Sequence, residues 1–333
     1  MRDPSFWWRP AGPAATALAP FAMCYGAVAR WRLGTTGRSV AIPVICIGNP
    51  TVGGSGKTPT AMAVARLLIA AGRRPFFLSR GYGGEIAGPV RVDPGVHRTL
   101  DVGDEPILLA RVAPTIVSRD RVAGAEAARF AGADVIVMDD GFQNPSLKKD
   151  LSILVIDGRS GIGNGKILPA GPLRAPLDAQ LDRAQALLVV GQPSGAQTVI
   201  SAAKSRKLPV FQGRLVPDRE TLAAHATRKV LAFAGIGHPE KFFATLDEAG
   251  IDVRVQLAYP DHHHYHRLEA MALLARAERD DLMLLTTEKD FVRIASEPDV
   301  SALLNVVRAL PVTLAVEQEQ AFRDLILGVV AGK

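Results

Sequence analysis

The eight residues Thr51-Val52-Gly53-Gly54-Ser55-Gly56-Lys57-Thr58 decide the fold of this 333-residue chain. They follow an apolar, β-branched run at residues 42–47 and precede residues 61–68, whose apolar side chains recur with helical spacing. The predicted order is therefore strand, glycine-rich loop and helix. Because a helix N-terminus carries partial positive charge and free N–H groups, this loop is expected to hold an anion, more specifically a phosphate.

The same stretch fits the phosphate-binding pattern G-x-x-x-x-G-K-[ST] at every position but the first, where Thr51 replaces glycine. In that pattern the loop cradles phosphates, the lysine reaches the β- and γ-phosphates, and the hydroxyl ligates Mg²⁺. We therefore predict an ATP site formed by all eight residues, with Lys57 on the phosphates and Thr58 on Mg²⁺. The alternative is a βα turn that binds nothing.

Composition places the chain among globular α/β proteins. Hydrophobic residues make up 48% of it, and strand-like runs alternate with helix-like segments throughout, as in folds built on a mostly parallel sheet. The two cysteines, Cys24 and Cys46, show no metal-binding spacing and favour a disulfide-free cytosolic protein. The net charge is only +6, and no basic face with interleaved aromatic residues indicates nucleic-acid binding.

The first 40 residues have an unusual composition. No charged residue occurs from 10 to 29, and five arginines accompany a single acid, Asp3. Tryptophans flank the uncharged span, as at a membrane interface. The tryptophans are Trp7, Trp8 and Trp31, and the arginines are Arg2, Arg9, Arg30, Arg32 and Arg38. A transmembrane helix, a cleaved signal peptide and a helix packed on the domain are alternatives, but a helix lying on the membrane surface is favoured.

The pattern along the chain predicts three parts. Residues 1–35 form the membrane-interacting helix, residues 36–205 a P-loop domain with a parallel sheet, and residues 206–333 a second, smaller α/β domain that closes over the site. The second domain is expected to include a strand at 312–315 and a final helix at 318–330.

A pair of acids follows another buried strand of the first domain. Residues 134–138 are apolar apart from their first residue, and the run leads directly into Asp139 and Asp140. On a P-loop fold, an acid at the end of such a strand holds Mg²⁺ directly or through water. We therefore predict that Asp139 and Asp140 join Thr58 at the metal, in preference to forming a solvated turn.

Two polar segments permit more than one interpretation. Asp104 opens a helical run two residues before a proline, and spacing alone favours a helix cap over a catalytic acid. Four histidines occur within residues 262–266, which invites a zinc site. Neighbouring side chains point to opposite sides, however, and no cysteine or spaced acid completes a tetrahedral set, so a metal there is disfavoured.

The order of these motifs resembles the tetraacyldisaccharide 4'-kinase family of lipid A synthesis (LpxK) over nearly the whole chain. The residues that carry the resemblance are 51–59, 79–84, 102–106, 139–143, 164–165, 168–174, 235–237, 261–262 and 286–290. Two positions depart from the family pattern: Asn144 stands where histidine is usual, and Ala175 where glutamate commonly follows. Neither is therefore expected to act in catalysis.

The resemblance implies an ATP- and Mg²⁺-dependent kinase. Its substrate would be an acylated glucosamine disaccharide 1-phosphate, phosphorylated on the 4'-hydroxyl to give lipid IVA at the cytoplasmic face of the inner membrane. No obligatory protein partner is implied. By position, Asp104 matches the family's catalytic aspartate and His262 the histidine that pairs with it, which replaces the capping interpretation of Asp104.

Two other classes of protein remain as alternatives. P-loop ATPases of the partition or metal-insertion type share the glycine-rich loop, but the partition type places an extra lysine where this chain has Val52. A nucleotide-regulated binding protein without chemistry is the second alternative. Phosphorylated product that depends on an acylated disaccharide would distinguish the kinase from both.

Overall fold

Nine strands form the larger of two sheets in the computed structural model, which describes residues 3–332. The strand order is β13-β8-β7-β6-β1-β5-β2-β4-β3, and only the two outermost pairings, β13 with β8 and β3 with β4, are antiparallel. The strands are β1 (Val44–Gly48), β2 (Pro75–Ser79), β3 (Val90–Arg91), β4 (Thr115–Val117), β5 (Val135–Asp139), β6 (Leu151–Asp157), β7 (Ala186–Val190), β8 (Val210–Pro217) and β13 (Val312–Val316). The predicted parallel α/β fold is confirmed.

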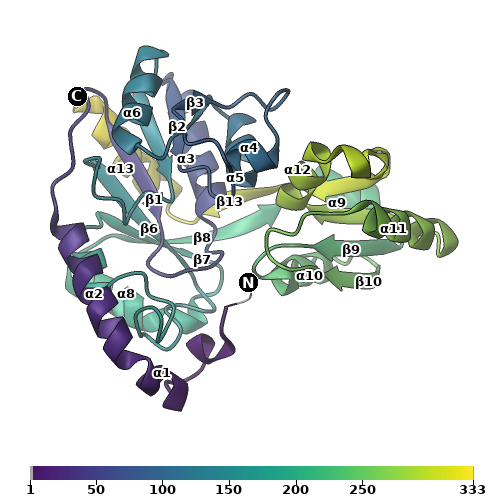
Figure 1. Ribbon diagram of the computed structural model, residues 1–333, viewed down its shortest axis with the longest axis horizontal. Helices are drawn as coiled ribbons and strands as arrows, with labels where there is room; N and C mark the ends of the chain where they lie inside the picture. Colours follow the sequence, from purple (N-terminus) through teal and green to yellow (C-terminus); the bar gives the residue numbers. More distant parts are fainter. Residues whose placement is uncertain (1–2, 333) are drawn as a thin grey trace.

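Helices cover both faces of this sheet (Figure 1). Successive residues of a strand face opposite sides, so in β5 Val137 packs into one core and Met138 into the other. On the first face lie α3 (Lys57–Ala70) and α13 (Glu319–Ala331). The opposite face is covered by α6 (Arg121–Phe130), α7 (Leu177–Leu181) and α8 (Gln197–Ser205). Burial on both faces explains why the strands read as continuous apolar runs.

A second, smaller lobe extends from the large one (Figure 1). Its parallel sheet has the order β10-β9-β11-β12, from β9 (Val230–Ala234), β10 (Val253–Ala258), β11 (Met283–Thr287) and β12 (Val307–Leu310). The helices of this part of the chain are α9 (Arg219–His225), α10 (Pro239–Glu248), α11 (Arg267–Arg279) and α12 (Glu288–Ser296), followed by the 3-10 helix η3 (Pro298–Asn305). The two lobes share apolar packing, because Val292 of α12 lies among Val102, Ile107 and Val117 of the large lobe.

The end of the chain returns to the large lobe. β13 pairs antiparallel with β8, and Phe322, Ile326 and Val330 of α13 are buried in the same core as α3. The expectation that strand 312–315 and helix 318–330 belong to the second α/β unit is therefore wrong. Helical or strand periodicity reports which face of an element is apolar, not which sheet it joins. The boundary between domains at residues 205 and 206 stays a prediction.

The N-terminal segment forms a 3-10 turn, η1 (Ser5–Trp8), and two helices, α1 (Pro13–Ala17) and α2 (Ala19–Gly34). α2 is anchored to the large lobe, since Gly26 lies against Ile167 and Arg30 forms a 2.7 Å ion pair with Asp178 of α7. Among residues 3–332, no helix combines the length and apolar character needed to cross a bilayer. Trp7 is buried, and its Nε1 donates to the Pro169 carbonyl, so the prediction that it lies at a membrane interface is wrong. Arg2, one of the five arginines named above, lies outside the described residues.

Candidate active site

The glycine-rich loop links the end of β1 to the start of α3, as the sequence predicts. Gly53 and Gly56 have φ angles of 91° and 88°, and residues with a Cβ rarely adopt this backbone conformation. A second loop supports this one from outside: the Val52 N–H donates to the Pro172 carbonyl, and Arg174 Nε donates to the Thr51 carbonyl, both at 2.9 Å. The glycine- and proline-rich segment at 161–174 therefore supports the glycine-rich loop.

Several buried polar atoms around this loop have no hydrogen-bond partner among the described residues. They are Asn49 Oδ1, Ser55 Oγ and Asp139 Oδ1. More than about nine in ten buried polar groups in folded proteins have a hydrogen-bond partner, so three buried polar atoms without one at a single loop are unusual. They are the groups that a polar ligand with phosphates and a cation would satisfy.

Asp139 and Thr58 lie together at the carboxyl edge of the large sheet. β5 and β1 are neighbours, and the Thr58 hydroxyl donates to Asp139 Oδ2 at 3.1 Å. Burial, reinforced by the negative charges of Glu105 and Asp140 and opposed by Lys57, raises the pKa of Asp139 to about 7. A buried carboxylate with one unpaired oxygen next to a hydroxyl is a donor set suited to Mg²⁺, which prefers oxygen ligands.

Asp140 lies beside Asp139 but has different partners. Its φ of 53° turns the chain away from the strand, and its carboxylate accepts from Arg174 Nη1 at 2.8 Å and lies 3.8 Å from Lys57 Nζ. Burial opposes ionisation, yet the charges of Lys57 and Arg174 lower the pKa of Asp140. In this arrangement Asp140 is the counter-ion of the lysine that the sequence assigns to phosphate.

Asp104 is the first residue of α5 (Asp104–Ala110), a helix of the large lobe. Gly103 is the residue that precedes the helix, and the only backbone N–H of α5 that the Asp104 side chain accepts is that of the adjacent Glu105, at 3.0 Å on Oδ1. The plain capping interpretation of Asp104 is therefore wrong. The other oxygen, Oδ2, faces the small lobe.

His262 meets Asp104 from across the gap between the lobes. Its Nδ1 lies 3.5 Å from Asp104 Oδ2, and its ring packs against Tyr82 with centroids 5.6 Å apart. Burial disfavours the charge of Asp104, but the hydrogen bond from His262 and the charges of Lys289 and Arg293 lower its pKa below the usual range. Conversely, the hydrogen bond to Asp104 raises the pKa of His262. The structure brings Asp104 and His262 together, one from each lobe, and their catalytic role stays a prediction.

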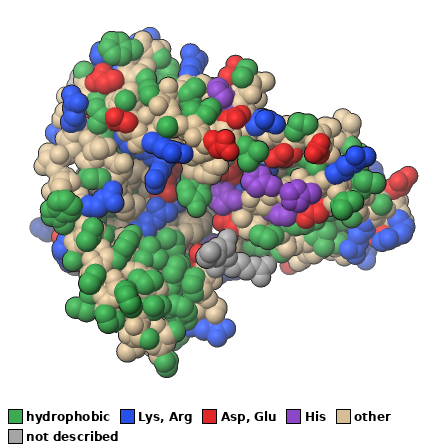
Figure 2. Space-filling view, viewed as in Figure 1, with side chains coloured by type: hydrophobic (Ala, Val, Ile, Leu, Met, Phe, Trp, Pro, Cys, Tyr) green, Lys and Arg blue, Asp and Glu red, His purple; other side chains and the backbone are tan. Residues whose placement is uncertain are grey.

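The histidines that follow His262 contact different carboxylates. His263 Nε2 lies 2.9 Å from Glu269, while His264 Nδ1 lies 3.4 Å from Glu297. Histidine side chains gather where the small lobe faces the large one (Figure 2). Their partners are separate, as expected for consecutive residues that point to opposite sides.

Two cations of α12 at this site were not assigned a role from the sequence. Lys289 Nζ donates to Glu105 Oε1 at 2.7 Å, and Arg293 reaches Asp104. The sequence contained a signal: Lys289 and Arg293 are four residues apart and would share one face of a helix.

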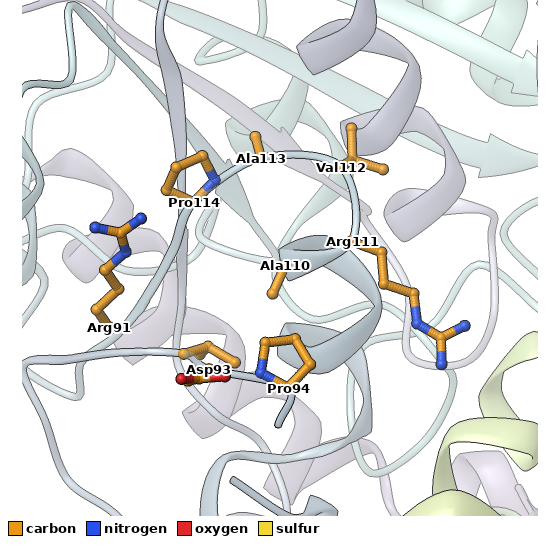
Figure 3. Close-up of a pocket in the computed structure, with 9 residues that line it drawn as sticks. Arg91, Asp93, Pro94, Ala110, Arg111, Val112, Ala113 and Pro114 are labelled. Carbon is orange, nitrogen blue, oxygen red and sulfur yellow. The ribbon is translucent and has the colours of Figure 1, made fainter. Parts of the chain in front are cut away.

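A surface cavity lies at the opposite end of α5, lined by residues 91–94 and 110–114. Its walls include Pro94, Ala110 and Pro114, and the guanidinium groups of Arg91 and Arg111 extend away from its centre (Figure 3). It therefore lacks converging donors for a phosphate. The polar cluster between the lobes is the better candidate for chemistry.

Comparison with known proteins decides the family. The family described as LpxK, tetraacyldisaccharide-1-P 4'-kinase, matches residues 14–331. The chain belongs to this family. A tetraacyldisaccharide 4'-kinase of Nitrobacter winogradskyi is 48% identical over 99% of this chain and 98% of its own length. One from Methylobacterium radiotolerans is 53% identical over 98% of each chain.

A solved structure supports the same conclusion. LpxK from Aquifex aeolicus, crystallised in complex with ATP, aligns with a TM-score of 0.74 and 27% identity over 95% of this chain and 99% of that one. The fold and family inferred from the motif order are thus confirmed. The match to the tetraacyldisaccharide 4'-kinase family covers both the glycine-rich loop and the second lobe, so the partition-type ATPase is not favoured.

Proposed function

We propose that this chain transfers the γ-phosphoryl group of ATP to the 4'-hydroxyl of tetraacyldisaccharide 1-phosphate, giving lipid IVA. The observation that carries the proposal is the arrangement of two opposed groups: the phosphate loop with Lys57 on the large lobe, and the Asp104–His262 pair that spans both lobes. Family membership over residues 14–331 supports the same reaction.

The loop from Thr51 to Thr58 would hold the triphosphate. Backbone N–H groups at the start of α3 and the Lys57 ammonium supply positive charge where the transferred group is most negative. Lys57 Nζ lies 3.8 Å from the Asp140 carboxylate. A phosphate oxygen would take the place of that carboxylate as its partner, while Arg174 keeps Asp140 in position.

Thr58, Asp139 and Asp140 are the residues that would hold Mg²⁺. The unpaired Oδ1 of Asp139 and the adjacent hydroxyl of Thr58 fit a hard cation with oxygen ligands. When bound, Mg²⁺ supplies neutralisation of phosphate charge. Asp140 contributes the second carboxylate at this edge of the sheet.

Asp104 would accept the proton of the attacking hydroxyl. The 4'-oxygen forms a bond to the γ-phosphorus, the bond from that phosphorus to the bridging oxygen of ADP breaks, and the released proton goes to the carboxylate. Since the pKa of Asp104 is lowered, transfer would come late, when the new P–O bond has made the hydroxyl strongly acidic. His262, from the other lobe, orients the carboxylate, so closing of the two lobes would complete the site and exclude water.

The N-terminal helices offer a surface for a lipid substrate. Apolar side chains gather over α1 and α2 (Figure 2), and the exposed ones on α2 are Phe21, Met23, Tyr25, Val28 and Trp31. Each buried methylene is worth about 0.8 kcal/mol, so an acylated disaccharide stays in the bilayer and the enzyme must reach it there. We infer a peripheral position at the cytoplasmic face of the inner membrane.

Substituting the α2 surface should release the protein from membranes. In M23S/W31S, two side chains that are 74% and 70% exposed become polar, and we expect binding to anionic phospholipid vesicles to fall by about tenfold or more, from the lost apolar burial. The matched control is V96S/F130S, in which the altered side chains are 73% and 78% exposed but lie away from α2. Equal loss in both variants, or loss in neither, would contradict this surface.

Transfer of labelled phosphate tests the reaction itself. With γ-³²P-ATP, Mg²⁺ and tetraacyldisaccharide 1-phosphate in detergent micelles, we expect label in the lipid and ADP release that depends on the disaccharide. ADP release that is independent of the disaccharide, without labelled lipid, would favour the ATPase alternative. If neither labelled lipid nor ADP is formed, the result would indicate a binding protein without chemistry.

A further inference from the structure

Arg293 is buried at the interface between the lobes. Its side chain is 2% exposed, and Nε donates to Asp104 Oδ2 at 3.0 Å, while Nη2 donates to the same oxygen. Nη2 also lies 3.5 Å from His262 Nδ1. One guanidinium thus contacts both members of the pair that we propose to act on the sugar hydroxyl.

The guanidinium is held in place by the small lobe. Nη1 donates to Asp290 Oδ1 at 3.0 Å and to the Gly235 carbonyl. Asp290 is completely buried and accepts three further hydrogen bonds, from the Gly235 N–H at 3.0 Å, the Tyr265 hydroxyl at 3.1 Å and the Thr287 hydroxyl at 2.6 Å. These contacts lie within the small lobe, so they orient Arg293 independently of its contact with Asp104.

The contacts to Asp104 divide between its two oxygens. Oδ1 accepts the Glu105 N–H of its own helix, and Oδ2 accepts Arg293 and lies near His262. The two lobes therefore hold the carboxylate from opposite sides. Rotation about its terminal bond would break a contact on one side or the other.

We propose that Arg293 is a positioning residue for catalysis, which fixes the Asp104 carboxylate and its contact with His262 so that the carboxylate faces the sugar hydroxyl only when the lobes are together. This inference rests on the proposed kinase function. The buried hydrogen bonds of Arg293 and Asp290 of α12 would then serve the reaction as well as hold the two lobes together.

Other contacts already join the lobes without touching Asp104. Lys289 pairs with Glu105 at 2.7 Å, Lys241 of α10 pairs with Asp157 of β6, and Val292 packs into the large-lobe core. A purely structural link would be duplicated by these contacts. It would not explain why two guanidinium nitrogens converge on the single oxygen of Asp104 that faces His262.

The test compares R293Q and R293K with the wild type. Glutamine removes the charge, and we expect kcat for phosphorylation of the disaccharide to fall by about 10- to 100-fold, the scale of a misplaced catalytic group. The KM for ATP should change less than about twofold, because ATP is bound by the phosphate loop. Lysine keeps the charge but cannot make the forked contact, so R293K should restore only part of kcat.

The pH profile should reveal that Arg293 acts through Asp104. The charged groups around this carboxylate are Glu105 of α5, Lys289, Asp290 and Arg293 of α12, and Asp261 and His262 of the facing loop. Removing the positive charge of Arg293 raises the pKa of Asp104, so the acidic limb of the kcat profile should move to higher pH in R293Q. In R293K the limb should stay close to that of the wild type.

K241Q is the control, since it removes a different ion pair between the lobes and leaves Asp104 untouched. We expect its acidic limb to be unchanged. NMR titration gives a readout independent of activity: the pKa of the His262 imidazole should rise in R293Q, because a neighbouring positive charge is lost. If the wild type lacked kinase activity, the proposed function would fail, but the titration would still test the placement of Arg293.

Unchanged kcat and pH profile in folded R293Q would overturn the proposal and leave the kinase function intact. The proposal would also be overturned if R293Q and K241Q lost activity equally and the acidic limb of the R293Q profile did not move. If R293Q failed to fold, as judged by circular dichroism, R293K would decide by the same measurements: wild-type kcat would count against a positioning role.

Discussion

Replacing Asp104 with Asn should lower kcat by about 10²- to 10⁴-fold, the usual contribution of a general base. The substituted amide keeps the size of the side chain and one acceptor oxygen but can no longer take the proton of the sugar hydroxyl. ATP affinity should survive, because the phosphate loop leads into α3 whereas Asp104 belongs to a separate helix, α5. The measurement is steady-state transfer of γ-³²P to the disaccharide, with nucleotide binding followed separately by calorimetry.

The stability of D104N must be checked beside its activity. Arg293 is almost completely buried, and loss of its ionised partner leaves a buried charge short of compensation. Such losses cost about 3–5 kcal/mol when a whole partner is removed, so a folded variant at the assay temperature is required. D324N, an exposed acid of α13, provides a control of the same chemistry. Wild-type kcat in folded D104N would remove Asp104 from the mechanism.

Replacing Lys57 with Ala should remove most of the activity by a different route. In the proposed mechanism the Lys57 ammonium stabilises the transferring phosphoryl group, and loss of one such preorganised group costs about 10²- to 10³-fold in kcat. Unlike D104N, K57A should also weaken ATP binding. Asp140 would lose one of its two ion-pair partners among the described residues and keep Arg174, which leaves more negative charge next to the proposed position of the phosphates.

K57R and K204A sharpen this prediction. Arginine keeps the charge but is planar and longer, so it should not restore full activity in a loop shaped for an ammonium. Lys204 belongs to α8, on the opposite side of the sheet from α3, and its loss should leave kcat unchanged. Full activity of K57A with normal ATP affinity would place the nucleotide somewhere other than this loop.

Local patterns were enough to predict the large sheet and the position of the glycine-rich loop on it. A glycine-rich loop between an apolar strand and a helix has few structural solutions, and Asp139 falls at the sheet edge next to Thr58 because β5 and β1 are neighbours. The position of the acidic pair at this edge was predicted for the same reason, because parallel strands end at a common edge.

Long-range relations could not be predicted from spacing. Nothing in the periodicity of residues 312–331 indicates that they pair with β8 and cover α3, because an apolar strand or helix face fits either sheet. Asp104 and His262 are 158 positions apart, and their pairing was expected from family resemblance alone. Arg293 was missed because a buried charge runs against the pattern by which core residues are recognised.

A crystal structure with a non-hydrolysable ATP analogue, Mg²⁺ and the acylated disaccharide tests the central claim most directly. The account predicts the triphosphate in the loop from Thr51 to Thr58, with the 4'-hydroxyl between the γ-phosphate and Asp104 and within hydrogen-bond distance of that carboxylate. A triphosphate bound elsewhere, or a 4'-hydroxyl remote from both Asp104 and His262, would contradict it.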